Sequence, residues 1–185
     1  MGLTGGNAGV SLPLGLRYCR GMDANTPDMP VEGRFVGREH RLGVRVYFED
    51  TDLSGVVYHA NYLRWMERGR SDMLRLAGID QRAAHKGGEG AYAVSELAIR
   101  YRAPARLDDA LVVASRLITI RPASCRIHQR VIHNGLILAD ADVTAVFVSP
   151  GGRARRQPAA WMAVFERLVW PGVDLAEPQF GAMGE

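Results

Sequence analysis

Residues 49–61, EDTDLSGVVYHAN, place three carboxylates within four positions and a histidine seven positions after the last of them. A carboxylate on a turn can act as a nucleophile or as a base that deprotonates water. Where a helix begins, the first backbone N–H groups lack intrahelical partners and the helix dipole is positive, so an oxyanion is favoured there. Asp52 and the helix start near His59 are therefore the candidate catalytic groups, and Asp50 is expected to order the turn.

Hydrophobic periodicity predicts the elements on either side of this turn. Apolar residues alternate with polar ones from Leu42 to Phe48, which is typical of a half-buried strand. From Asn61 the apolar residues recur at helical spacing and predict a helix of about five turns. Asn61 is expected as the N-cap of this helix, and Gly78 as the glycine just after its last turn.

Four further extended segments follow the helix, at residues 91–103, 110–120, 124–133 and 136–148. Asn134-Gly135, between the last two, fits a two-residue type I′ hairpin turn, and a short terminal helix is expected at 158–168. This order predicts an α+β fold with a five-stranded antiparallel sheet. One helix cannot cover both faces of such a sheet. Either the other face is solvated or it packs against another subunit, and strands that are apolar on both faces favour the second arrangement.

Composition restricts the class of protein. The chain has 185 residues, 47% of them hydrophobic and 23% charged, which indicates one globular domain, and its net charge of +3 is too small to imply nucleic-acid binding. Cys19 and Cys125 form neither a CxxC motif nor a disulfide framework, so a reducing, cytoplasmic compartment is expected. The sequence contains no run of about 18 apolar residues, so it predicts no membrane-spanning helix. His128 and His133 are expected on opposite faces of a strand, so they predict no metal site.

The two ends of the chain differ from its centre. Residues 1–38 are rich in glycine and proline without a sustained periodicity, and they are expected to form a flexible N-terminal extension. The folded domain is expected at residues 39–170, followed by a C-terminal tail at 171–185.

The stretch VRVYFEDTDLSGVVYHANYLRWMERGRSDMLRLAGI resembles the opening of the Tol-Pal-system-associated acyl-CoA thioesterases. These enzymes belong to the 4-hydroxybenzoyl-CoA thioesterase-like branch of the hotdog fold, in which a sheet wraps around one long central helix. The resemblance covers residues 40–168, and YRAPARLDD and GGRARRQP extend it downstream. Its most specific positions are Asp50, Asp52, Gly55, Val56, Tyr58, His59, Asn61 and Tyr62.

The resemblance implies hydrolysis of a short-chain or aromatic acyl-CoA, with water and without a metal or redox cofactor. It assigns Asp52 as nucleophile or general base and the His59 backbone N–H as the group that polarises the thioester carbonyl, and it leaves a direct role of the His59 imidazole open. Phe48 stands where some relatives have a tyrosine, so the role of that hydroxyl does not transfer. The substrate-binding residues implied are Gly55, Val56, Tyr58, Asn61, Arg121, Arg153 and Arg155.

The resemblance also implies homodimers, often paired into tetramers, with the active site at the subunit boundary. It places the protein in the cytoplasm or at the inner face of the membrane.

Three alternatives stay open. Glu67 on the helix is a rival catalytic carboxylate. A hotdog dehydratase is less favoured because those relatives separate Asp and His by about five residues rather than the seven found in this chain. A non-catalytic protein that binds acyl-CoA or an acyl carrier protein would need the same pocket, but it would gain nothing from a carboxylate beside the thioester.

Overall fold

The computed structural model describes residues 30–171, and the folded unit begins at Val31. The expected extension up to residue 29 and the expected tail from residue 172 lie outside the described residues. None of the helices within 30–171 is long and apolar enough to cross a membrane.

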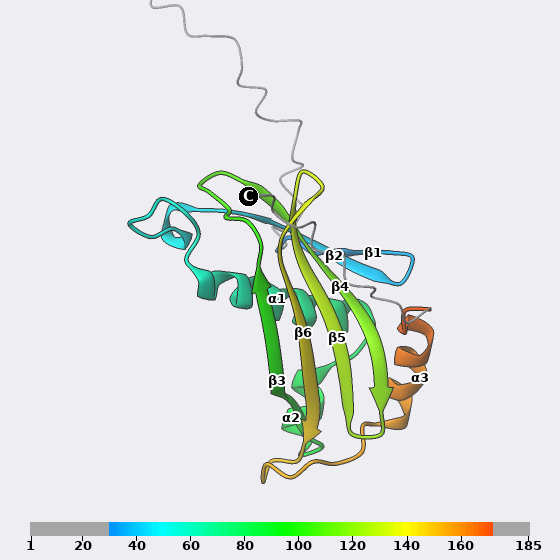
Figure 1. Cartoon of the computed structure of the whole chain (residues 1–185). Coiled ribbons are helices and arrows are strands. Elements are labelled where there is room, and N and C mark those ends of the chain that lie inside the picture. The colour runs from blue at the N-terminus through cyan, green and yellow to red at the C-terminus, as the bar shows by residue number, and fades with distance from the viewer. Residues whose placement is uncertain (1–29, 172–185) are drawn as a thin grey trace, which may run out of the picture. The chain divides into compact units, whose positions relative to one another are not determined.

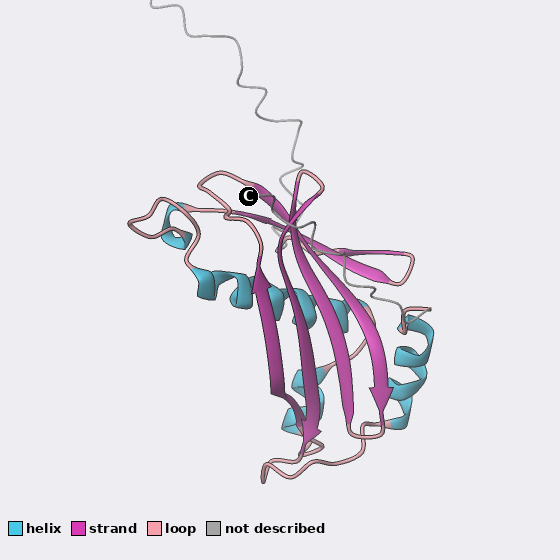
Figure 2. Cartoon of the chain, viewed as in Figure 1, coloured by secondary structure: helices cyan, strands magenta, loops and turns pink. Residues whose placement is uncertain are grey.

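Six antiparallel strands form one sheet in the order β1-β2-β4-β5-β6-β3 (Figures 1 and 2). The strands are β1 (Arg34–Val36), β2 (Glu39–Arg45), β3 (Ala91–Tyr101), β4 (Ala110–Arg121), β5 (Ser124–His133) and β6 (Leu136–Val148). The helices are α1 (His59–Leu76), α2 (Gln81–Lys86) and α3 (Ala159–Leu168), and a 3₁₀ turn covers Phe48–Asp50. The expected four extended segments and terminal helix are present, and α2 is an element that the sequence pattern did not predict.

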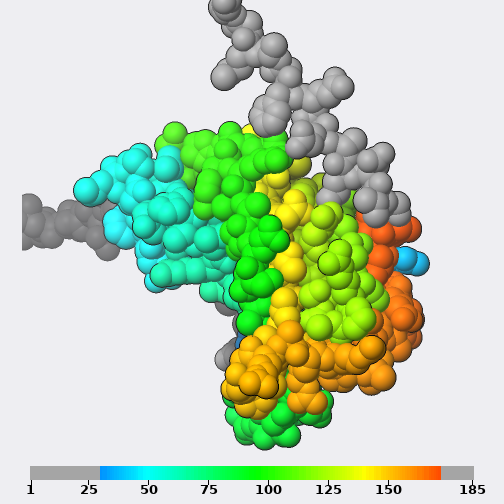
Figure 3. All heavy atoms as spheres, turned by 60° about the horizontal axis from the view of Figure 1, so that its bottom comes forward, coloured from blue at the N-terminus to red at the C-terminus, as the bar shows by residue number. Residues whose placement is uncertain are grey.

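One face of the sheet packs on the long helix α1 (Figure 1). Most of the apolar stripe predicted from residue 61 is buried: Tyr62, Trp65 and Met66 form a core with Leu111 and Val113 of β4. Leu76, at the end of the helix, is 37% exposed. The helix α3 covers a second cluster of buried residues through Phe165. At the surface, β3, β6 and β5 lie side by side (Figure 3).

The sheet has six strands rather than the expected five, because Arg34–Val36 forms β1 within the segment expected to be an extension. Gly37, with a φ of 60°, turns the chain so that β1 pairs back onto β2. A three-residue strand among glycines and prolines is too short to produce a visible alternation in the sequence.

The first predicted strand also ends earlier than its alternation suggested. The strand β2 ends at Arg45, and although Val46 is fully buried, Phe48 is 82% exposed. The chain turns into the 3₁₀ segment there, because the Asp50 side chain accepts a hydrogen bond from the Tyr47 backbone N–H at 2.8 Å.

Helix α1 begins two residues before the predicted cap. Its N-cap is Tyr58 rather than Asn61. Its end is as predicted: Gly78 has a φ of 78°, and the Ile79 N–H donates to the Leu74 carbonyl at 2.9 Å, which closes the last turn. The hairpin prediction is also confirmed, since Asn134 and Gly135 both have positive φ.

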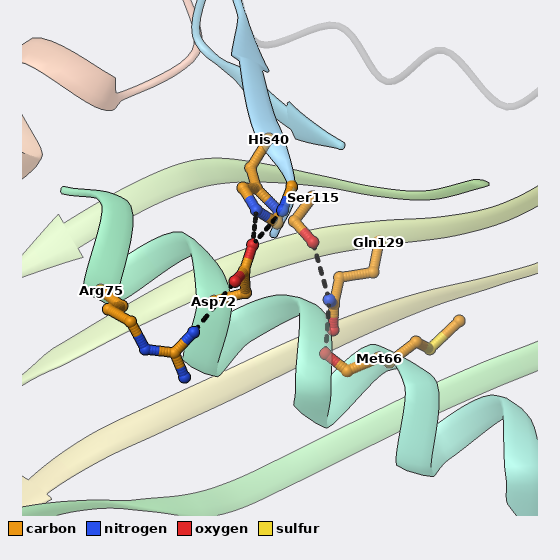
Figure 4. A network of polar contacts seen from close by, with 7 residues as sticks. His40, Met66, Asp72, Arg75, Ser115 and Gln129 are labelled. Atoms are coloured by element: carbon orange, nitrogen blue, oxygen red, sulfur yellow. Dashed lines mark hydrogen bonds and ion pairs between the residues drawn. The ribbon is translucent and has the colours of Figure 1, made fainter. Parts of the chain in front are cut away.

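Buried polar side chains connect α1 to the sheet (Figure 4). His40 of β2 lies 2.7 Å from Asp72 of α1, between Nε2 and Oδ2. Gln129 of β5 donates through Nε2 to the Met66 carbonyl at 2.9 Å and to the Ser115 hydroxyl at 2.8 Å. Because these groups are shielded from water, each bond fixes where α1 lies on the sheet.

Candidate active site

The loop between the 3₁₀ turn and α1 presents Asp52. The Tyr58 N–H donates to the Asp50 carbonyl at 2.9 Å, which joins the two ends of the loop. Inside it, the Asp52 N–H donates to the Val56 carbonyl at 3.1 Å, and the Gly55 N–H donates to the Asp52 carbonyl at 3.0 Å. Gly55 has a φ of 74°, a conformation that glycine adopts without steric cost. Asp52 is therefore on a small closed loop that ends where α1 begins.

The Asp52 side chain is a solvent-exposed, ionised carboxylate. Its Oδ1 accepts hydrogen bonds from the Ser54 hydroxyl and, at 2.8 Å, from the Ser54 N–H. The Ser54 hydroxyl, followed by the Ser54 N–H, lowers the pKa of Asp52 below its ordinary value, and the nearby His59 contributes in the same direction. These donors favour the charged form, so the group is poised as a base or nucleophile at neutral pH.

His59 is the first residue of α1, and its backbone N–H has no acceptor within the helix. The carbonyl of His59 accepts a hydrogen bond from the Tyr101 hydroxyl at 3.0 Å, which ties the start of the helix to the end of β3. Burial raises the pKa of Tyr101, so this hydroxyl keeps its proton and remains a donor. The His59 ring lies between those of Tyr58 and Tyr101, with centroids at 4.4 and 6.3 Å.

An open cavity of about 600 Å³ lies at the start of α1. Its walls are mainly apolar and aromatic, with Arg102 as the charged residue among them. The lining residues are Val56, Val57, His59, Tyr62, Tyr101, Arg102, Ala103 and Pro104. The cavity is thus next to the helix end that can bind an oxyanion and to the loop that presents Asp52.

The predicted site residues divide into two groups. Gly55, Val56 and Tyr58 share the loop with Asp52, and Asn61 lies beneath it with only 5% of its surface exposed. The other group, Arg121, Arg153 and Arg155, does not lie near the Asp52 loop.

The three arginines lie far from Asp52 in the single chain. Arg155 donates to the carbonyl of Glu89, just before β3 begins, whereas Tyr101 at the other end of β3 contacts His59. Those two ends of β3 are about 33 Å apart, at roughly 3.3 Å per residue. Arg121 lines another depression, of about 610 Å³, and Arg153 is exposed on the loop that precedes α3. The predicted arginines therefore belong to the opposite end of the sheet.

The rival carboxylate Glu67 lies two turns along α1 from His59. It forms an ion pair with Arg70 and accepts a hydrogen bond from the Ser71 hydroxyl at 3.2 Å. It borders a more enclosed pocket between α1, β3 and α3, whose apolar walls include the buried thiol of Cys125. This carboxylate is paired with Arg70 and lies apart from the helix start.

Tyr101 and Arg102 are site residues that sequence reasoning missed. They come from the stretch YRAPARLDD, which the resemblance matched without a role for each residue. No local pattern signals that the end of β3 meets a helix start 42 residues earlier in the chain.

Residues 46–168 match the thioesterase-like superfamily. The chain belongs to this superfamily. It is 38% identical over 129 residues to the acyl-CoA thioester hydrolase YbgC of Escherichia coli O6:H1, covering 69% of this chain and 96% of that protein. It is 41% identical over 108 residues to the acyl-CoA thioesterase YbgC of Haemophilus influenzae, covering 58% of this chain and 79% of that protein.

Solved structures agree with this placement. A probable thioesterase from Bartonella henselae superposes with a TM-score of 0.62 at 36% identity, covering 65% of this chain and 99% of that one. A 1,4-dihydroxy-2-naphthoyl-CoA thioesterase from Synechocystis has a TM-score of 0.64 at 21% identity, over 68% of this chain and 94% of that one, and shows the shared fold alone. The hotdog fold expected from the sequence is confirmed, with one strand more than predicted.

Proposed function

We propose that this protein hydrolyses acyl-CoA thioesters to a carboxylic acid and coenzyme A, with Asp52 as the nucleophile or general base. The observation that supports this most directly is the ionised, exposed Asp52 carboxylate on a loop closed against the first residue of α1. The two YbgC proteins described above have names that specify hydrolysis of acyl-CoA thioesters.

The reaction follows from this geometry. The thioester carbonyl oxygen accepts a hydrogen bond from the His59 N–H at the positive end of α1, a donor worth about 10²–10³ in rate. Asp52 either attacks the carbonyl carbon, expelling the coenzyme A thiolate and leaving an anhydride that water hydrolyses, or takes a proton from the attacking water. The thiolate then gains a proton to become the free thiol.

The cavity at the helix start supports a short-chain or aromatic acyl group as substrate. Its mainly apolar lining and its aromatic walls, Tyr62 and Tyr101, suit a compact apolar group. The motif at residues 50–62 supports assignment to the 4-hydroxybenzoyl-CoA thioesterase-like branch and the Tol-Pal-associated group within it. We place the reaction in the cytoplasm on the same grounds.

The first experiment measures release of free coenzyme A from acyl-CoAs ranging from acetyl to palmitoyl, together with one aromatic thioester. The wild type, Asp52→Asn and Glu67→Gln are compared, each confirmed folded by circular dichroism. We expect Asp52→Asn to lose about 10³-fold or more in kcat and Glu67→Gln to stay within about threefold of the wild type. The reverse pattern would assign the reaction to Glu67. Binding of acyl-CoA without turnover by the wild type would make the protein a binding partner.

We propose an acyl carrier protein as a second donor of the acyl group. The same assay with acyl-acyl carrier protein in place of acyl-CoA tests this partner. Hydrolysis at a comparable kcat/KM would support it, and turnover of acyl-CoA alone would argue against it.

We further propose that a second copy of the chain pairs with the free edge of β3. Within the described residues β3 pairs with β6 alone, and it exposes Val94 (48%), Leu97 (36%) and Tyr101 (46%). Antiparallel pairing of two β3 edges about their midpoint would bring the Tyr101 end of one strand beside the Ala91 end of the other. The helix start of one copy would then lie near the enclosed pocket of the other.

Sedimentation velocity tests this pairing. The wild type is expected to sediment as a dimer or tetramer, and Leu97→Asp as a smaller species, because an exposed edge strand with a charge resists pairing. Leu136→Asp, at an exposed position beside the hairpin tip, is the control and should leave the assembly unchanged. Gly135→Ala would not serve as a control, because alanine is strained at the positive φ of this position. A monomeric wild type would contradict the proposal.

A further inference from the structure

The side chain of Asn61 lies directly under the loop that presents Asp52. Its Nδ2 donates a hydrogen bond to the Asp50 carbonyl at 2.9 Å. The Tyr58 N–H donates to the same carbonyl, also at 2.9 Å. Two donors from the start of α1 therefore hold one backbone oxygen, which lies two residues before Asp52.

Asp50 connects this anchor to the rest of the loop. Its Oδ2 accepts the Tyr47 N–H at 2.8 Å, which fixes the turn before the loop. Immediately after it, Thr51 forms a β-bridge with Val57, which pairs the entering and leaving segments of the loop. A shift of the Asp50 peptide relative to α1 would thus move the whole loop, including Asp52, relative to the His59 N–H.

We propose that Asn61 is a positioning residue for the thioester hydrolysis proposed above: its carboxamide fixes the Asp52 loop against the first turn of α1. The proposal rests on the proposed function. Hydrolysis requires the carboxylate and the oxyanion donor to approach one carbonyl group together, and a displacement of about 1 Å can cost about 10²-fold in rate.

Direct binding of the substrate by Asn61 fits its surroundings less well than a positioning role. Only 5% of its surface is exposed, and it is not among the residues that line the cavity at the helix start. Both ends of its carboxamide are occupied, since Nδ2 donates to Asp50 and Oδ1 accepts a bond from Arg64 at 3.3 Å. Asn61 therefore acts through the loop and not on the acyl-CoA.

Gln129 provides a matched control within the same protein. It is also a buried carboxamide that donates to a backbone carbonyl, that of Met66, further along α1. It lies on β5, however, and none of its hydrogen bonds involves the Asp52 loop. Truncation of either residue removes a buried carboxamide, but only Asn61→Ala releases the loop.

The test compares kcat, KM and thermal midpoint for the wild type, Asn61→Ala, Asn61→Asp and Gln129→Ala. We expect kcat to fall about 10–100-fold in Asn61→Ala, with KM changed less than about threefold. Gln129→Ala should keep kcat within about threefold although its thermal midpoint falls at least as far. Asn61→Asp retains the size of the side chain without its N–H donors, so it should lose kcat as Asn61→Ala does, and it serves if the alanine variant does not fold.

Hydrogen exchange of residues 51–57 supplies a readout independent of turnover. Exchange should accelerate in both Asn61 variants and stay unchanged in Gln129→Ala. A kcat within about threefold of the wild type in the folded Asn61 variants, or an equal loss in Gln129→Ala, would overturn the positioning role. A wild type that hydrolyses no acyl-CoA would instead overturn the proposed function and this role with it.

Discussion

Ser54 contacts one oxygen of Asp52 with two hydrogen bonds: its hydroxyl and its backbone N–H both donate to Oδ1. Both bonds go to the same carboxylate oxygen, so Ser54 holds Asp52 through Oδ1. The hydrogen bond from the Ser54 hydroxyl makes the Asp52 carboxylate a weaker base. The same bond keeps the carboxylate ionised and fixes its orientation. The balance between these effects can be measured through pH.

Replacing Ser54 by alanine should move the acid limb of the pH profile upward. The Ser54 hydroxyl is the main cause of the lowered pKa of Asp52, and hydrogen bonds to a carboxylate favour its charged form. Its loss raises that pKa toward the ordinary value of 3.8, so kcat/KM should fall at a higher pH than in the wild type. Thr51→Val, which removes a loop hydroxyl bonded to the Phe48 carbonyl instead, should leave the limb in place. An unmoved limb in Ser54→Ala would contradict this role of the hydroxyl.

Tyr101→Phe should lower kcat by about three- to tenfold without unfolding the protein. The variant loses one hydrogen bond to the His59 carbonyl, and a typical net hydrogen bond is worth about 1 kcal/mol. Without it, the first turn of α1 is held less firmly against β3. Steady-state kinetics on the best acyl-CoA provide the measurement, with Tyr47→Phe, at an exposed tyrosine outside the cavity, as control. Equal kcat values for the two variants would show that the bond has no role in turnover.

Gly33→Ala should destabilise the fold by about 1–3 kcal/mol. A methyl group there would lie 2.5 Å from His40 Nε2 and 2.7 Å from Asp72 Oδ2, the buried pair seen in Figure 4. The Gly33 N–H also donates to that Asp72 oxygen at 2.9 Å, so the segment cannot move away without losing a bond. Gly43→Ala is the control, because a methyl group at Gly43 would meet no atom within 4 Å. Urea unfolding measures both variants, and similar midpoints for the two would refute the prediction.

Glu39→Gln should make the stability of the protein less sensitive to acid. Burial disfavours the charged form of Glu39, but hydrogen bonds from Arg41 and Arg116 and the charge of Arg130 outweigh it and leave the pKa below the usual 4.5. A carboxyl group whose pKa is lowered by folding stabilises the protein at pH values above its pKa in the unfolded state. This stabilisation is lost as the pH falls through the pKa of the folded state.

At pH 7, Glu39→Gln should therefore cost about 2 kcal/mol in the free energy of unfolding, and the difference from the wild type should shrink toward pH 3. Denaturant titrations at both pH values measure it. Glu166→Gln, at an exposed carboxylate on α3, should show no such pH-dependent difference. A difference that widens toward pH 3 would mean that folding raises the pKa of Glu39 instead of lowering it.

Local signals predicted the local features well. Gly78 marked the end of α1, and Asn134-Gly135 marked a hairpin, because each needs a backbone conformation that few residues adopt. The prediction of Asn61 as the N-cap was wrong because its side chain donates a hydrogen bond to the Asp50 carbonyl. That contact depends on how the preceding loop closes. The Tyr101 contact with His59 depends on the pairing of whole strands, which no short window of sequence contains.

The buried thiol of Cys125 has a consequence for an enzyme whose product is itself a thiol. Burial raises the pKa of Cys125 to about 11, so at pH 7 only about one thiol in 10⁴ would be ionised. Disulfide exchange proceeds through the thiolate. Coenzyme A disulfides that accumulate under oxidising conditions would therefore react with this sulfur extremely slowly, and the described fold should resist inactivation by the oxidised form of its own product.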